Sequence, residues 1–144
     1  MAIKLKFKGF EDKIEKIQKV GGSVDKAVEI CMKKSAEIVE TELKSQMQKA
    51  NVPADLTNAM PSSKVFKDGN VYVAKVGYEK GEYDPENPSV AYKVIFLNYG
   101  TPKRSKHGKV KARGFIQKAR RKATPQVKKQ QEQALNEILE RLEE

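Results

Sequence analysis

Very few residues in this 144-residue chain have the chemistry of a catalytic site. The single histidine, His107, lies between Lys106 and Gly108 in a strongly basic loop, and the single cysteine, Cys31, falls on the apolar stripe of a predicted helix. Nucleophilic catalysis needs a nucleophile, a base and an orienting acid in fixed geometry, which a mobile loop does not provide. A thiol on an apolar stripe packs as an inert small hydrophobe. We therefore expect no catalysis from either residue, and a hydrolase or nuclease is disfavoured.

Metal and nucleotide sites are not predicted either. One cysteine excludes an internal disulfide bond and a multi-cysteine zinc site. The chain contains neither GxxxxGK[ST] nor GxGxxG, the glycine-rich motifs that bind phosphates. One group of acidic residues lacks the glycine and the spacing of a calcium loop: Glu79, Glu82, Asp84 and Glu86. We expect a protein without cofactor or metal.

The strongest chemical signal is a basic window between Gly100 and Glu132, which contains twelve Lys or Arg residues and no acid. The whole chain carries a net charge of +10, so the residues outside the window sum to −2 (10 − 12). Such a window is typical of a phosphate-binding surface, because neutralised phosphates release counterions. Its only aromatic residue, Phe115, is predicted to be buried, so stacking platforms are missing, and no recognition helix is evident. Non-specific DNA contact, a solvated surface and a docking patch for an acidic protein all remain open.

The element predicted most clearly is one long helix. Ser23 is a good N-cap, and an apolar stripe continues from Val24 to Met47 with charged residues on the opposite face. The helix should end near Ala50. Cys31 and Leu43 lie on the stripe, and both should be buried.

Short strands and turns are expected around this helix. Residues 2–7 alternate apolar and basic side chains and predict a half-exposed strand, and a short helix should follow over about 10–20. Residues 51–63 read as a long connection. Residues 64–78 predict a β-hairpin, because the Asp-Gly pair at 68–69 has the chemistry of a tight turn.

The last third predicts helices around the basic loop. The apolar residues 90–98 fit a buried strand or a buried helix, and periodicity does not decide between them. Phe115 begins a helical face, and Thr124-Pro125 predicts the start of a final amphipathic helix, with Thr124 as N-cap. The fold class is α+β: a long N-terminal helix, a small antiparallel sheet with a hairpin, and C-terminal helices. We expect one domain over 1–144, in which 1–22 form an N-terminal extension of strand and short helix.

The stretch LNYGTPKRSKHGKVKARGFIQKA resembles the small head–tail joining or tail-completion proteins of long-tailed bacteriophages and prophages. That family has an aromatic-Gly-Thr motif after an apolar segment, a variable loop, and an Ala-Arg-Pro-Phe-like motif that opens a helix. The matching residues here are Tyr99, Gly100, Thr101, Ala112, Arg113, Phe115 and Ala119. The departures are Asn98 where the family usually has Glu, Gly114 in place of the proline, and Lys118 where a second proline is common.

The resemblance implies a structural virion protein without catalysis, which assembles into a ring at the neck of the particle. Its implied partners are other copies of itself, the head connector and the tail tube, with possible non-specific DNA contact. Its implied location is the virion, after assembly in the bacterial cytoplasm. We expect no membrane association, because the longest apolar run, Val94–Leu97, is far shorter than the ~20 residues that span a bilayer. The alternative function is that of a small basic protein that binds nucleic acid non-specifically.

Residues 101–113 are predicted to form an exposed basic arm between two anchors, Gly100 and Phe115. The arm cannot bury enough apolar surface to offset an ordering entropy of roughly 1–2 kcal/mol per residue. We therefore predict that 103–111 are mobile in the isolated protomer and become ordered against a partner. The expected contact residues are Lys103, Arg104, Lys106, His107, Lys109, Lys111 and Arg113.

Overall fold

The computed structural model describes residues 2–7, 9–69, 71–78, 89–100 and 111–143. The elements follow in the order β1 (Ala2–Lys6), α1 (Glu11–Lys19), α2 (Val24–Lys49), α3 (Ala54–Asn58), β2 (Lys64–Asp68), β3 (Val71–Gly77), α4 (Val90–Tyr99) and α5 (Phe115–Glu143). The α+β prediction is confirmed. The acidic group at 79–86, Thr101 and most of the predicted arm lie outside the described residues.

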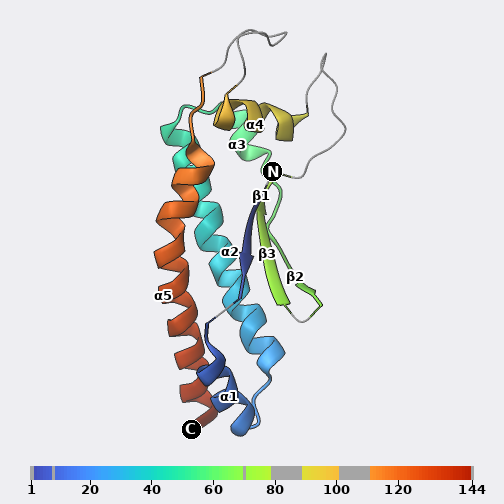
Figure 1. The fold of residues 1–144 in the computed structure, drawn as a ribbon, viewed down its shortest axis with the longest axis vertical. Helices are drawn as coiled ribbons and strands as arrows, with labels where there is room; N and C mark the ends of the chain where they lie inside the picture. Colours follow the sequence, from blue (N-terminus) through green and yellow to red (C-terminus); the bar gives the residue numbers. More distant parts are fainter. Residues whose placement is uncertain (1, 8, 70, 79–88, 101–110, 144) are drawn as a thin grey trace.

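Two long helices form the body of the molecule. Figure 1 shows α2 and α5 side by side and antiparallel along the long axis, with the sheet on the other side of α2. The short helix α1 lies at the lower end, and α3 and α4 lie at the upper end. The C-terminus of α4 and the N-terminus of α5 therefore meet at the end of the molecule opposite to α1.

The three strands form an antiparallel sheet in the order β1-β3-β2. In this register Ile3 is opposite Val76, and both are almost fully buried against the helical layer. On the alternate face, Lys4 of β1 and Lys64 of β2 are both opposite Lys75 of β3. Successive side chains of a strand point to opposite faces, so one face of the sheet packs into the core, and the other carries these lysines beside the apolar pair Phe66 and Val73.

The predicted long helix is confirmed in its cap, its extent and its buried stripe. The Ser23 hydroxyl accepts a hydrogen bond from the backbone N–H of Lys26, as an N-cap residue does. Cys31 and Leu43 are 0% and 2% exposed. Burial raises the pKa of the Cys31 thiol to about 11, so the sulfur stays protonated and unreactive at neutral pH.

A buried polar cluster joins α2 to α5. The Ser35 hydroxyl donates to the carbonyl of Cys31 at 2.7 Å, and Gln131 Nε2 donates to Ser35 Oγ at 3.1 Å. Gln130 Oε1 lies 3.1 Å from the same hydroxyl. A buried amide that finds its partner in only one alignment fixes the register of the two helices.

The structure decides one open question and corrects two predictions. Residues 90–99 form a helix, α4. The segment 51–63 contains the short helix α3, so it is not a simple connection. The predicted helix start at Thr124-Pro125 is wrong, because α5 continues through Pro125.

The physical reason is that packing outweighs the local proline signal. Ala119, Ala123 and Val127 form one buried stripe on α5, so an interruption at Thr124 would expose it. Pro125 itself is on the exposed side, where the carbonyl that it leaves without a helical partner can bind water. The Thr124 hydroxyl donates to the carbonyl of Arg120 at 2.7 Å instead of capping a helix.

Candidate contact site at the base of the basic arm

The two ends of the predicted arm are joined by backbone hydrogen bonds. The N–H of Arg113 donates to the carbonyl of Leu97 at 3.0 Å, and the N–H of Gly114 donates to the carbonyl of Asn98 at 3.0 Å. The last turn of α4 is thus tied to the residues that precede α5. The end of α4 and the start of α5 are consequently held together at the upper end of the molecule in Figure 1.

Two glycines make this arrangement possible. Gly100 ends α4 with a φ of 78°, and its N–H donates to the carbonyl of Phe96 at 2.8 Å. Gly114 has a φ of 62°. Both values lie in the left-handed region that glycine adopts without a steric penalty. A proline at 114 is excluded in this conformation, because its ring fixes φ near −65° and it has no N–H to donate.

Asn98 connects the two sides of the arm base through its side chain. It is only 1% exposed, and its Oδ1 accepts a hydrogen bond from the N–H of Ile116 at 2.9 Å. Asn98 thus caps the N-terminus of α5 from another helix. Its Nδ2 is buried and has no hydrogen-bond partner among the residues that the structure describes.

Arg113 is bound to the body of its own chain. Its guanidinium donates to the carbonyls of Ala50 and Asn51, both at 3.1 Å, at the C-terminus of α2. A cation at a helix C-terminus is stabilised by the unpaired carbonyls and by the dipole. Arg113 was expected to contact a partner, and the structure gives it this intramolecular contact. The family-motif arginine thus links α2, α4 and α5.

The remaining motif residues divide into anchors and surface. Phe115 and Ala119 are both 0% exposed and hold the first turns of α5 on the core. Tyr99 is 54% exposed at the end of α4, and Ala112 and Lys111 are exposed beside it. Sequence reasoning found the anchors, Gly100 and Phe115. It missed the roles of Asn98 and Arg113, because the distances that define those roles depend on how α4 meets α5.

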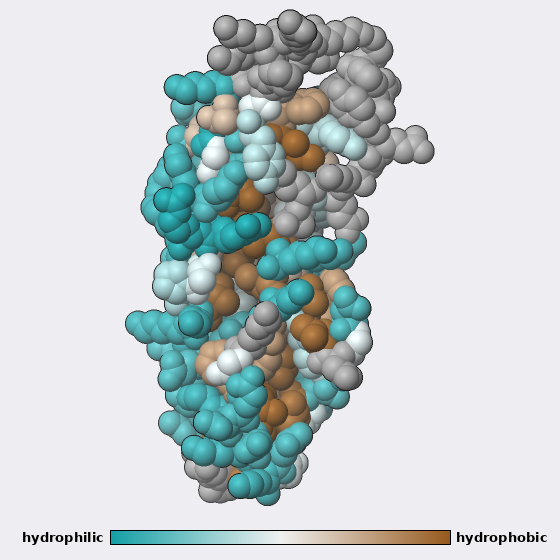
Figure 2. Space-filling model, in the orientation of Figure 1, coloured by the Kyte–Doolittle hydropathy of each residue, from teal (hydrophilic) through white to brown (hydrophobic). Residues whose placement is uncertain are grey.

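The basic window continues onto the exposed side of α5, where it carries six cations: Lys118, Arg120, Arg121, Lys122, Lys128 and Lys129. No ion pair involves any of them in the part of the chain that the structure describes. Figure 2 shows the α5 side as a largely hydrophilic surface, with a hydrophobic band between it and the sheet. The upper half of α5 is thus an uncompensated basic surface beside the arm base.

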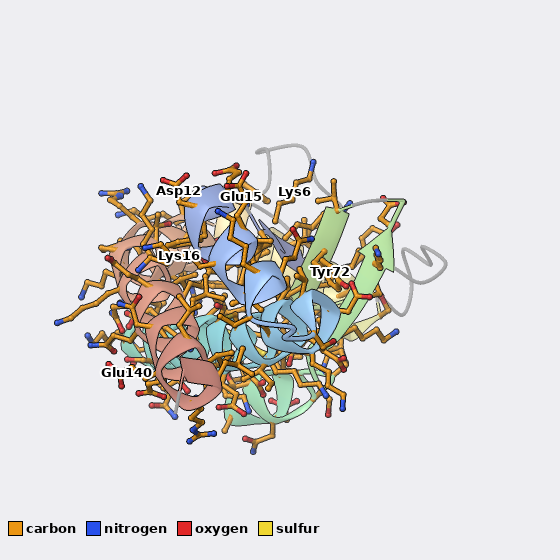
Figure 3. All side chains as sticks on the ribbon, turned by 90° about the horizontal axis from the view of Figure 1, so that it is seen from below. Lys6, Asp12, Glu15, Lys16, Tyr72 and Glu140 are labelled. Atoms are coloured by element: carbon orange, nitrogen blue, oxygen red, sulfur yellow. The ribbon has the colours of Figure 1, made fainter. Side chains whose placement is uncertain are left out.

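The lower end of the molecule is different in character. Asp12, Glu15 and Lys16 project from α1 with mixed charge, and Glu140 lies on α5, away from the sheet that carries Tyr72 (Figure 3). The hydrogen bond from the Tyr72 hydroxyl lowers the pKa of the Asp25 carboxyl and raises the pKa of Tyr72 to about 12. These groups tie the sheet to the start of α2.

The described hollows do not suggest catalysis. A shallow groove of about 340 Å³ lies between α1, α2 and the sheet and is lined mainly by apolar side chains, among them Phe7, Phe10 and Ile14. Within the described residues, no three His, Cys, Asp or Glu side chains gather into a group able to hold a metal ion. None of the described helices combines the length and the hydropathy that crossing a bilayer requires.

The comparison with known protein families bears on the class of small structural phage components that the motif resembles. Residues 9–100, nearly two thirds of the chain, match the protein family described as "Bacteriophage HK97-gp10, putative tail-component". The chain belongs to this family, and it is a structural phage protein. The match ends at Gly100, so Arg113, Phe115 and Ala119 lie beyond it. Neither a curated protein nor a solved structure matches the chain significantly.

Proposed function

We propose that the protein is a head–tail joining or tail-completion subunit that assembles into a ring at the neck of the virion and has no catalytic activity. The single observation that supports this most strongly is the construction of the arm base. The bonds from Arg113 and Gly114 to α4 give a highly charged segment a fixed origin. A fixed base with a charged extension suits a subunit that touches its neighbours in a closed assembly. The phage tail-component family supports the same reading.

In this proposal the arm provides the intersubunit contact and the body provides the scaffold. Residues 103–111 become ordered against an adjacent subunit, the head connector or the tail tube, so part of the binding free energy is spent on ordering. Tyr99 and Lys111, both exposed at the arm base, extend the contact onto the described surface. The protein is made in the bacterial cytoplasm and ends in the neck of the particle.

The second candidate, non-specific binding of nucleic acid, is favoured by the unpaired cations of α5. Phosphate contacts of that kind weaken steeply as salt rises. We expect only weak, sequence-independent association with duplex DNA at ~150 mM salt. A nanomolar complex with one defined sequence at that salt would replace the structural proposal.

Hydrogen exchange on the free protein tests the arm. We expect fast exchange across 103–111, with protection in 90–98 and 115–122, where helical bonds and burial hold the amides. Strong protection of the arm in a demonstrated monomer would mean that it folds onto its own body, and the partner-docking role would be wrong.

Replacement of 103–111 by a Gly-Ser linker of equal length tests the assembly role. We expect a folded protein that fails to join heads to tails when particles are examined by electron microscopy. The matched control replaces exposed cations of α2 (Lys33, Lys34 and Lys49) with Ser, which should leave joining intact. Normal particles with the linker variant would contradict the proposal.

A further inference from the structure

The exposed side of α5 carries one stripe whose charge changes sign along its length. Seven exposed residues recur at intervals of three or four, which places them on one face of the helix: Lys118, Lys122, Gln126, Lys129, Gln133, Glu137 and Glu140. The upper part of this stripe is basic, the middle has Lys129 between the amides Gln126 and Gln133, and the lower part is acidic. The helix spans 29 residues and is about 43 Å long, and the two charged parts lie toward its opposite ends.

This order of charges opposes the intrinsic preference of a helix. Anionic side chains stabilise the N-terminus and cationic ones the C-terminus, because the unpaired N–H and C=O groups carry partial charges. In α5 the first turn contains no acid, and four bases occur between 118 and 122. Glu137 and Glu140 lie near the other end, where Arg141 is the one base of the last turn. The order is unfavourable for the isolated helix, so an explanation outside the helix is required.

The body of the protein does not supply that explanation. Within the described residues, the ion pairs of α2 join Lys33 to Glu29, Lys44 to Glu40 and Asp25 to Lys67 of β2, and none of them reaches α5. The one ion pair of α5 in this part of the chain joins Glu132 to Lys13. Lys118, Lys122, Glu137 and Glu140 have no ion-pair partner among the described residues. Both charged parts of the stripe are therefore available to another molecule.

We propose that the partner of this stripe is α5 of a second copy of the chain, packed antiparallel. Reversal of the helix direction places the basic part of each copy against the acidic part of the other. With Lys122 opposite Glu140 of the second copy, Lys129 faces Gln133, and Gln126 lies beside Glu137. The contact is isologous, so every favourable pair occurs twice. The opposed helix dipoles also compensate the charges that a single α5 leaves at its ends.

The contact closes on two copies, and it goes beyond the proposed ring, which does not depend on it. Exposed ion pairs are individually weak, so the dimer should be weak and sensitive to salt. It contains no apolar anchor, because the stripe residues are all charged or amide. Sedimentation at high protein concentration is therefore the appropriate measurement.

The test is a charge exchange on the full-length protein. One variant carries Lys118→Glu, Lys122→Glu and Lys129→Glu, and the other carries Glu137→Lys and Glu140→Lys. We expect the unaltered protein to dimerise at a protein concentration of about 0.5 mM in about 20 mM salt. It should become monomeric near 0.5 M salt, where the Debye length falls to ~4 Å and the ion pairs are strongly screened. Each variant alone should remain monomeric, and an equimolar mixture should form a heterodimer more tightly than the unaltered chain.

A charge-matched control separates this contact from a general effect of net charge. The variant Lys33→Glu, Lys34→Glu, Lys49→Glu makes the same change on exposed positions of α2 and should dimerise like the unaltered protein. Circular dichroism checks that all variants fold. A monomeric unaltered protein at low salt, or two variants that do not associate when mixed, would overturn the proposal. Saturable binding of short duplex DNA by the basic part, without self-association, would overturn it in favour of a polyanion.

Discussion

The two long helices α2 and α5 pack against each other but distribute their charges in opposite ways. α2 contains five acids and five bases, mixed along its length, and it forms the (i, i+4) ion pairs Lys33–Glu29 and Lys44–Glu40. It begins with its own cap, Ser23. α5 has all its bases except Arg141 before its first acid, Glu132, and obtains its N-terminal acceptor from Asn98 on α4. The local sequence of α2 thus favours its own helix, whereas α5 depends on its surroundings.

This difference indicates that the two helices have different roles. α2 contacts the sheet, α3 and α5, and ten of its residues are buried. A helix in that position is selected for packing and intrinsic stability. α5 carries an uncompensated surface next to the arm, and unfavourable local choices tend to occur where function requires them. We therefore place the scaffold in α2 and the contact surface in α5 and the arm base.

The largest effect that would test the scaffold role is expected for Leu43→Ala. Leu43 is 2% exposed in the core cluster, so its truncation should lower the free energy of unfolding by ~2–5 kcal/mol. Ile30→Ala on the exposed side of the same helix is the control, because Ile30 is 45% exposed, and it should cost less than ~1 kcal/mol. Equal losses in urea titrations would show that α2 is not the scaffold.

Gly114→Pro should disrupt the arm base. The change imposes an incompatible φ and removes the N–H that donates to Asn98, so we expect a loss of about 3 kcal/mol or more. Gly114→Ala tests the conformation alone. A Cβ at 114 would meet nothing within 4 Å. The free energy of unfolding should therefore fall only by the penalty for a left-handed backbone at alanine, about 1–2 kcal/mol. A stable proline variant with normal exchange protection of the Arg113 amide, the other donor of the bridge, would mean that the bond from Gly114 is dispensable.

The sequence predicted the elements whose signals are local. The stripe from Val24 to Met47 and the Ser23 cap define α2, and Asp68-Gly69 defines the hairpin, because each depends on residues a few positions apart. The same reasoning failed at Thr124-Pro125, where long-range packing of α5 outweighs a local proline signal. Signals from residues a few positions apart therefore predict the bounds of α2 well and the start of α5 poorly.

The arm base was predicted only in part, for a related reason. Gly100 and Phe115 were identified because a chain reversal needs glycine and a returning helix needs an apolar anchor. The contacts of Arg113 with Ala50 and of Asn98 with Ile116 span 63 and 18 positions. Their geometry depends on the tertiary arrangement, which no spacing rule gives.

Asn98→Ala tests whether α5 needs its external cap. Loss of Oδ1 leaves the buried N–H of Ile116 without its acceptor, and we expect a cost of about 1–3 kcal/mol. Asn98→Asp keeps an acceptor at the same place and removes the unpaired Nδ2, so it should cost less at neutral pH. If thermal unfolding shows equal losses for the two variants, the cap is not what stabilises this end of α5.

The smallest expected effect comes from the same Lys→Glu change made in each long helix. It tests the contrast between α2 and α5 most directly, because the change in stability should have opposite signs in the two helices. Lys118→Glu puts an acid in the first turns of α5, four residues before Lys122, and should raise the stability of the monomer by ~0.3–1 kcal/mol. Lys33→Glu in the middle of α2 removes the pair with Glu29 and places like charges four residues apart, so it should cost a few tenths of a kcal/mol. Both should be measured by chemical unfolding at low salt and at ~1 M salt, where the two differences should shrink together. A destabilising Lys118→Glu in the monomer would mean that the basic residues of α5 already serve its own fold, and the separation between a scaffold helix and a contact helix would have to be given up.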